Sequence, residues 1–127
     1  MNEPIVFISH FRIKPHQFDA FRAHFQEGAP ELHVAKPRTV AFLAYADEAG
    51  TRVSIVHLFS DADAMDFHFE GAEQRSEAAY EFLEPDGWEI YGAPSTAALT
   101  MMQQGAALAG VTLRVQPGAV GGFLRDC

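Results

Sequence analysis

Two histidines, His57 and His68, are the side chains in this sequence that are best suited to acid–base chemistry. The ordinary pKa of an imidazole lies close to neutral pH, so a histidine can act as a general base without much adjustment. Such a base would remove a proton from an activated phenol or enol and leave an electron-rich anion that reacts with O2. We therefore treat His57 and His68 as candidate catalytic residues. Ser9, in a neighbouring predicted strand, is a candidate substrate-binding residue.

The other candidate substrate-binding residues are aromatic. Tyr80 carries a hydroxyl group on an apolar body and borders the apolar stripe of a predicted helix. The chain contains eleven phenylalanines, which either line an apolar pocket or fill an ordinary core. Those that we expect to line a pocket near the histidines are Phe21, Phe25, Phe42 and Phe69.

The same residues also have a purely structural interpretation. Buried histidines are usually hydrogen-bonded core residues that have no catalytic role. A metal site made of His57, His68 and either Asp61 or Glu70 is a further alternative. However, the six histidines include no HxH or HxxxH pair, so we expect no metal and no other cofactor.

The two histidines flank the junction between a predicted strand and a predicted helix. Residues 52–59 are apolar or alternate in polarity, as in a half-buried strand. Ser60, with Asp63 at the capping-box spacing, predicts the start of one helix over residues 61–84. The apolar stripe of this helix consists of Met65, Phe69, Ala72, Ala79 and Leu83.

The N-terminal half of the chain predicts a strand, a helix and a hairpin. Residues 5–13 alternate as a strand, and a helix from Pro15 to about Lys36 follows, which we expect Gly28 and Pro30 to kink or break. The hairpin consists of residues 39–46 and 52–59, joined at Asp47–Gly50. Pairing Ala46 with Thr51 places Val40, Phe42 and Ala44 on the same face of the sheet as His57.

The C-terminal third predicts shorter elements. Residues 85–87, Pro-Asp-Gly, indicate a turn before a short strand at 88–92. A third helix is capped by Ser95 and ends at Gly110. Two extended runs follow, at residues 111–115 and 121–125.

This order, β-α-β-β-α-β with an added helix and an extended tail, predicts an α+β ferredoxin-like fold. In that fold an antiparallel sheet carries both main helices on one face. The 127 residues fit a single domain, with residues 95–127 as a C-terminal extension. The uncovered face holds too many hydrophobic side chains for a monomer, so we expect a homodimer through this face. These side chains are Val6, Ile8, Leu43, Val56 and Leu58.

Composition excludes several classes of partner. The net charge is −8 and only nine lysines and arginines are present, so binding to nucleic acid or to an anionic membrane is not expected. The single cysteine, Cys127, can form no internal disulfide. No apolar run approaches the ~20 residues that span a bilayer, and the N-terminus lacks the basic region of a signal peptide. We expect a cytoplasmic protein that binds a small molecule.

Four segments resemble proteins of one known superfamily. They are IVFISHFRIKPHQFDAFRAHF (5–25), PRTVAFLAYADEAG (37–50), SDADAMDFHFE (60–70) and EIYGAPSTAAL (89–99). The first three are similar to the dimeric α/β-barrel superfamily, and within it to the antibiotic-biosynthesis-monooxygenase-like proteins. The fourth resembles an uncharacterised bacterial branch of that group, and the resemblance extends over nearly the whole chain.

This resemblance implies a homodimer of ferredoxin-like subunits whose sheets form a barrel, with a pocket between sheet and helices in each subunit. Characterised members include cofactor-independent oxygenases of polycyclic phenols and haem-degrading enzymes. Both groups use an Asn and a Trp at the pocket. Here the single Asn is Asn2 and the single Trp is Trp88, and neither stands where that chemistry would need it.

Three functions therefore compete. The first is a cofactor-independent monooxygenase-like protein that acts on a small aromatic or enolisable substrate. The second is a non-catalytic binder of a small apolar ligand or of haem, and the third is a structural dimer. A polar group of residues enclosed in an apolar pocket would favour the first.

Overall fold

The computed structural model describes residues 3–125, so Asn2 and Cys127 lie outside the described part of the chain. Its elements follow one another in the order β-α-β-β-α-α-β-α-β. The strands are β1 (Ile5–Ile13), β2 (Thr39–Ala46), β3 (Arg52–Phe59), β4 (Leu83–Tyr91) and β5 (Leu113–Gln116). The helices are α1 (Phe18–Ala35), α2 (Ala62–Phe69), α3 (Ala72–Ala79) and α4 (Thr96–Ala109).

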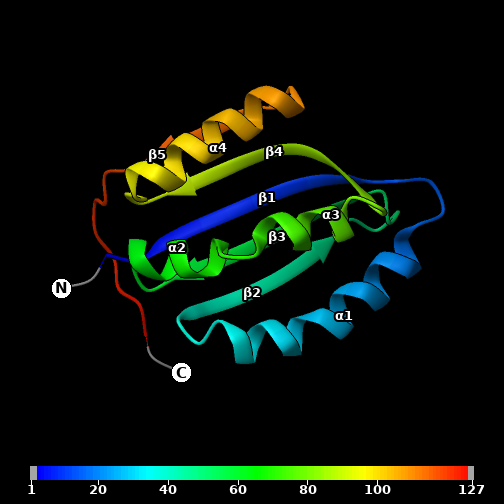
Figure 1. Cartoon of the computed structure of the whole chain (residues 1–127), viewed down its shortest axis with the longest axis horizontal. Helices are drawn as coiled ribbons and strands as arrows, with labels where there is room; N and C mark the ends of the chain where they lie inside the picture. The colour runs from blue at the N-terminus through cyan, green and yellow to red at the C-terminus, as the bar shows by residue number, and fades with distance from the viewer. Residues whose placement is uncertain (1–2, 126–127) are drawn as a thin grey trace.

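The strands form one five-stranded sheet in the order β2-β3-β1-β4-β5, with β1 at its centre (Figure 1). The pairs β1–β3, β1–β4 and β2–β3 are antiparallel, whereas β5 is parallel to β4. The α+β ferredoxin-like fold expected from the sequence is confirmed, and β5 adds one strand to it. Within residues 3–125 the sheet is open and is not closed into a barrel.

The helices cover one face of this sheet (Figure 1). One core cluster joins Met65 of α2 and Met102 of α4 to Phe7 of β1. A second cluster joins Phe21 of α1 to Phe11 of β1. Both strand residues are odd-numbered, and the odd-numbered residues of β1 are all buried. Since alternate residues of a strand point to opposite faces, all of these contacts lie on the same side of the sheet.

The hairpin of β2 and β3 has the predicted bounds, but its register differs by two residues. Ala46 pairs with Val53 and not with Thr51, and Phe42 pairs with His57. A shift of two residues preserves the faces, so Phe42 and His57 share the helix-covered face as expected. The register also shifts between Thr39 and Ala41, and Val40 is 54% exposed. The prediction that Val40 faces inward is therefore wrong, because this irregularity turns its side chain outward.

The helix expected over residues 61–84 is two helices, α2 and α3, separated by Glu70 and Gly71. Gly71 has a φ of 80°, a left-handed conformation that glycine adopts easily and that ends a helix. The predicted N-cap, Ser60, is also wrong by one residue. Asp61 is the N-cap, and its carboxylate accepts a hydrogen bond of 2.8 Å from Ala64 N–H.

Strand β4 begins at Leu83, five residues before the start that we predicted. Pro85 and Gly87, which we expected in a turn, lie inside the strand. The pairing of β1 with β4 shifts its register between His10 and Phe11, opposite this segment. A bulge accommodates a proline within a strand because the ladder is already interrupted there.

Helix α1 runs continuously from Phe18 to Ala35 with Pro30 inside it, so the chain does not break there. It begins three residues later than predicted, after Gln17. Helix α4 has the predicted ends, because Ser95 accepts a hydrogen bond from Ala98 N–H and Gly110 adopts a φ of 69°. Residues 121–125 form no strand. In the described part of the chain, no helix combines the length and the apolar character that crossing a membrane requires.

Candidate functional site

His57 of β3 and His68 of α2 lie side by side beneath the helices. Their ring centroids are 5.2 Å apart and the rings meet edge to face, at 83°. The two residues are 7% and 3% exposed, so both are buried. The strand–helix junction brings them together, because β3 ends two residues after His57 and α2 returns across the same face of the sheet.

An aromatic shell surrounds the histidine pair. Phe7 and Phe42 lie 4.8 and 5.2 Å from His57 between ring centroids. Phe59 lies 5.1 Å from His68, and Phe69 lies 6.1 Å from the same ring. Of the predicted pocket residues, Phe42 and Phe69 are therefore in direct contact with the pair.

The other two predicted phenylalanines extend this shell toward α1. Phe25 stacks on Phe42 with their centroids 4.9 Å apart, and Phe21 lies 6.0 Å from Phe25. Phe21 is buried in the second core cluster. A continuous row of rings thus runs from the histidines along the inner side of α1.

Both histidines form a hydrogen bond through Nδ1. His57 Nδ1 lies 3.1 Å from the carbonyl oxygen of Phe7. A carbonyl only accepts, so Nδ1 carries the proton and Nε2 of His57 keeps its lone pair. His68 Nδ1 lies 2.8 Å from Thr39 Oγ1, which can donate or accept.

The second ring nitrogen of His68, Nε2, is not completely sealed from solvent. Among residues 3–125, every side-chain nitrogen or oxygen that is sealed from solvent has a hydrogen-bond partner. The structure gives His68 Nε2 no hydrogen bond to any described residue, so this atom cannot be sealed. A ligand group or a water molecule can therefore approach it.

Burial lowers the pKa of both histidines well below the near-neutral value that we expected from the sequence. The pKa of His57 falls to about 4, mainly through burial. The pKa of His68 falls to about 3, first through burial and then through repulsion from a protonated His57 and from the charges of Arg75 and Lys36. Both rings are neutral at pH 7, so both can accept a proton, but each is a weak base until a negative charge lies beside it.

Two basic residues that the sequence did not single out stand beside the pair. Lys36, 8% exposed, donates from Nζ to the Phe67 carbonyl at 2.7 Å and lies 4.3 Å from the Phe67 ring centroid. Arg75 of α3 donates to the carbonyls of His68 and Glu70. Both side chains thus hold the end of α2. Sequence reasoning missed them because neither belongs to a motif.

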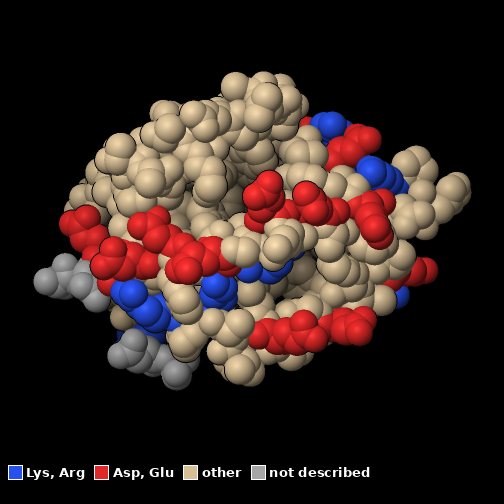
Figure 2. Space-filling model, viewed as in Figure 1, with Lys and Arg blue, Asp and Glu red and all other residues tan. Residues whose placement is uncertain are grey.

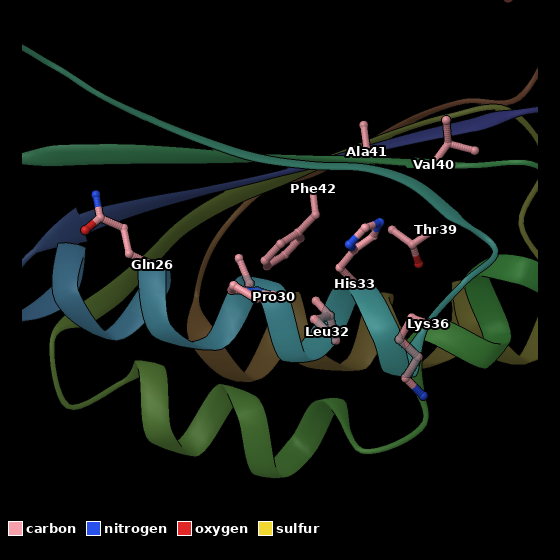
Figure 3. Close-up of a pocket in the computed structure, with 10 residues that line it drawn as sticks. Gln26, Pro30, Leu32, His33, Lys36, Thr39, Val40, Ala41 and Phe42 are labelled. Carbon is pink, nitrogen blue, oxygen red and sulfur yellow. The ribbon is translucent and has the colours of Figure 1, made fainter. Parts of the chain in front are cut away.

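A groove of about 420 Å³ lies between α1 and β2 (Figure 3), and neither His57 nor His68 is among the residues that line it. Phe42 points from β2 toward α1 in this view, and His33 points from α1 toward β2. Thr39 and Phe42 connect the groove to the histidine pair. Thr39 is hydrogen-bonded to His68, and the Phe42 ring contacts both histidines. The lining residues are Gln26, Ala29, Pro30, Leu32, His33, Lys36, Thr39, Val40, Ala41 and Phe42.

Ser9 and Tyr80 lie outside this contact shell. Ser9 is buried on the same face, between Ile55 and Trp88. Tyr80 is 37% exposed and packs against Phe11, with their centroids 6.4 Å apart. The described part of the chain gives neither residue a hydrogen bond or ring contact with His57 or His68. It also contains no group of three or more metal-binding side chains placed to hold an ion.

Comparison with protein families identifies the chain. A family model described as antibiotic biosynthesis monooxygenase matches residues 4–80. The chain belongs to this family. The matched part includes β1, α1, the hairpin, α2 and α3, and therefore both histidines, the groove and the basic pair.

Solved structures similar to this family member share its fold. MupZ from Pseudomonas fluorescens has a TM-score of 0.73 at 15% identity, covering 98% of this chain and 96% of its own. SnoaB, a cofactor-independent oxygenase from Streptomyces nogalater, has a TM-score of 0.60 at 14% identity, covering 73% and 95%. Rv0793 from Mycobacterium tuberculosis has a TM-score of 0.60 at 16% identity, covering 75% and 99%. No curated protein matches the chain.

MupZ matches almost the whole of this family member, including the part that follows the family model. In this part Trp88 lies beside Gly105 of α4, where an added Cβ would be in van der Waals contact with the indole, and it packs against the core cluster of β1 and β4. Trp88 is thus a packing residue of the β4–α4 layer.

Proposed function

We propose that this protein is a cofactor-independent monooxygenase-like enzyme whose substrate is a small aromatic or enolisable molecule bound in the α1–β2 groove. The observation that carries the proposal is the pair of neutral, buried histidines, joined to that groove through Thr39 and Phe42. In this proposal His68 and His57 are the catalytic residues. Phe42, Phe25 and the other rings hold the substrate against them.

The proposed chemistry begins with a proton transfer to a histidine. The substrate's acidic O–H or C–H gives its proton to an unprotonated imidazole nitrogen and becomes a phenolate or enolate. This anion transfers one electron to O2, and the resulting substrate radical and superoxide combine to a peroxide anion. The imidazolium returns its proton to this anion, which gives a hydroperoxide. Loss of water then leaves one oxygen atom on the substrate as a carbonyl, so a CH2 group and O2 yield C=O and H2O.

The low pKa values of the histidines set a condition on this step. A base with a pKa of about 3 or 4 removes a phenol proton only if the products are stabilised together. The imidazolium and the substrate anion would form in contact, in a low-dielectric site where their attraction is strong. The aromatic shell provides apolar surroundings that strengthen this attraction.

Oxygen uptake tests the proposal. Purified protein would be supplied with hydroquinones and anthrones, and the rate compared with those of His57→Gln, His68→Gln and the control His24→Gln. His24 is a matched control because it also packs on an aromatic ring, Phe82, at 5.2 Å, away from the groove. We expect each site variant to lose about 10²–10⁴-fold in rate. Equal rates in all variants would remove the histidines from the mechanism.

A second candidate function is a binder of a small apolar ligand or of haem. The pKa values of about 4 and 3 favour it, since histidines this weakly basic also suit an apolar binding site without turnover. Titration with haem distinguishes the two, because binding would produce a Soret band without oxygen consumption. The absence of binding and of turnover would leave the structural dimer.

We further propose that a second copy of the chain covers the open face of the sheet. Exposed Leu43 and Tyr45 (47% and 63% exposed) stand on this face beside half-buried apolar side chains. Burying such a patch stabilises an interface. The half-buried members are Val6, Ile8, Val56 and Leu58. Measuring the molar mass of the protein in solution tests this proposal, and a protein that is entirely monomeric at micromolar concentration would contradict it.

A polar cluster lies within the same face. His10 Nδ1 lies 2.7 Å from Ser54 Oγ, and His10 Nε2 contacts the Glu89 carboxylate, which also accepts a hydrogen bond from Tyr91. We propose that this cluster is an interface element of the dimer. A cytoplasmic location and a small-molecule partner complete the proposed function.

A further inference from the structure

Lys36 and Arg75 hold two positive charges near the histidines without a carboxylate to neutralise them. Lys36 is buried and Arg75 is half-buried. Other basic side chains form ion pairs with acidic ones, namely Arg12, Arg22, Arg38 and Arg52. Within residues 3–125, no carboxylate lies within 4 Å of the charged groups of Lys36 and Arg75. Buried charges are normally paired, so this arrangement needs an explanation.

The hydrogen bonds of these two side chains do not supply the missing charge. Lys36 and Arg75 donate only to neutral carbonyls of residues 67, 68 and 70, at the end of α2. The negative end of a helix dipole amounts to about half an elementary charge. The two histidines add no negative charge. A chain with a net charge of −8 therefore keeps an excess of positive charge at this site.

Lys36 is the part of this excess that borders the groove. Lys36 lines the groove together with Thr39 and Phe42. Figure 3 shows it at the end of the groove near Thr39, with Nζ directed toward the segment between α2 and α3. Figure 2 shows a hollow in the surface between α3 and α1, where basic side chains are visible between rows of acidic ones.

The ammonium group of Lys36 has hydrogen-bonding capacity to spare. It carries three N–H donors, and the Phe67 carbonyl takes one of them. A hydrogen bond between an ammonium and an anionic oxygen is about twice as strong as one between neutral groups. In a site shielded from water this attraction is strengthened further.

We propose that the groove selects an anionic ligand, an apolar ring body that carries a carboxylate, phenolate or enolate oxygen, with Lys36 as the residue that determines this specificity. Arg75 adds a positive field without direct contact. The inference deepens the proposed function by naming its substrate class. It also holds for a binder, because it concerns binding and not turnover.

The test compares two probes of the same shape that differ in charge. The dissociation constants of 2-naphthoate and of neutral 2-naphthamide would be measured by calorimetry at pH 7.5 and 0.15 M salt. We expect wild type to prefer naphthoate. In Lys36→Met, the dissociation constant of naphthoate should rise by about tenfold to a hundredfold, whereas that of naphthamide should change less than twofold.

Lys14→Met is the matched control. Lys14 Nζ donates to the carbonyl of Tyr80, just after α3, at 2.6 Å, so it also caps the end of a helix, but it does not line the groove. We expect both probes to bind this variant as they bind wild type. Lys36→Arg retains the charge and should retain the preference for naphthoate, which keeps the test decisive if Lys36→Met does not fold.

Three results would overturn the inference. Equal affinity of wild type for the two probes is the first. An equal loss for both probes in Lys36→Met is the second, since it would make Lys36 only a helix cap. Loss of preference in Lys36→Arg in a folded protein is the third. None of these depends on oxygen uptake, so failure of the enzyme proposal would be seen separately.

Discussion

The buried histidine pair makes stability depend on pH in a way that can be calculated. In the unfolded chain each histidine has a pKa of about 6.5, whereas in the folded protein the values are about 4 and about 3. Below pH 6.5 the two histidines are protonated in the unfolded state but stay neutral in the folded state until the pH approaches their lowered pKa values. The stabilising contribution of the two neutral rings is therefore complete above pH 6.5 and is lost as the pH falls toward the folded values.

The magnitude follows from the size of this window. At pH 5 both rings are still neutral in the folded protein, while both are protonated in the unfolded chain. The difference from the unfolded pKa is about 1.5 pH units, and each unit is worth about 1.36 kcal/mol, so each histidine should destabilise the fold by about 2 kcal/mol. A loss of about 4 kcal/mol is a large part of the stability of a typical domain.

Urea unfolding at pH 5.0, 5.5, 6.0, 6.5 and 7.0 measures this effect at one fixed protein concentration, because association would otherwise shift the result. His57→Phe and His68→Phe remove one titrating group each from the aromatic shell. We expect each to reduce the slope of the unfolding free energy between pH 6 and pH 5 by nearly one proton. A double variant whose slope equals that of wild type would refute the reasoning.

Three further predictions concern the elements around the site. Asp61→Ala removes the N-cap of α2 and its hydrogen bonds to Arg38, so urea unfolding should show a loss of about 1–2 kcal/mol; an unchanged midpoint would contradict the cap. Gly71→Ala places an alanine in the left-handed conformation, with its Cβ 3.3 Å from Arg75 Nη1. We expect it to lower the free energy of unfolding by about 1–2 kcal/mol, more than Gly110→Ala, where the added Cβ has open space around it. Ile8→Asp should give a monomer by light scattering if the sheet face is the interface, whereas a persistent dimer would place it elsewhere.

The hairpin and the face of the sheet that carries His57 were predictable because local signals specify them. The alternation of residues 39–46 and 52–59, with the short connection between them, gave both strands their bounds. A register error of two residues did no harm, since side chains alternate with a period of two. The alternation by itself therefore places His57 and Phe42 on the correct face of the sheet.

Other features depend on contacts between distant segments and had no local signal. The end of α2 is stabilised by Lys36 and Arg75, which donate to carbonyls that any sequence would offer. Pro85 and Gly87 indicated a turn, but pairing with β1 holds them in a strand. The low pKa values also arise from burial in the assembled fold, which no residue type reveals by itself.

The central position of β1 has a consequence for how the chain is made. The ribosome synthesises β1 early, yet its two neighbours in the sheet are β3 and β4, at residues 52–59 and 83–91. Until both have emerged, the apolar side chains of β1 have no sheet to join. Pairings between distant segments slow folding and expose strand edges to aggregation. The yield of folded protein from cells should therefore depend on the interval between the synthesis of β1 and that of β3 and β4. Slower translation of residues 14–91 lengthens this interval and should lower the yield.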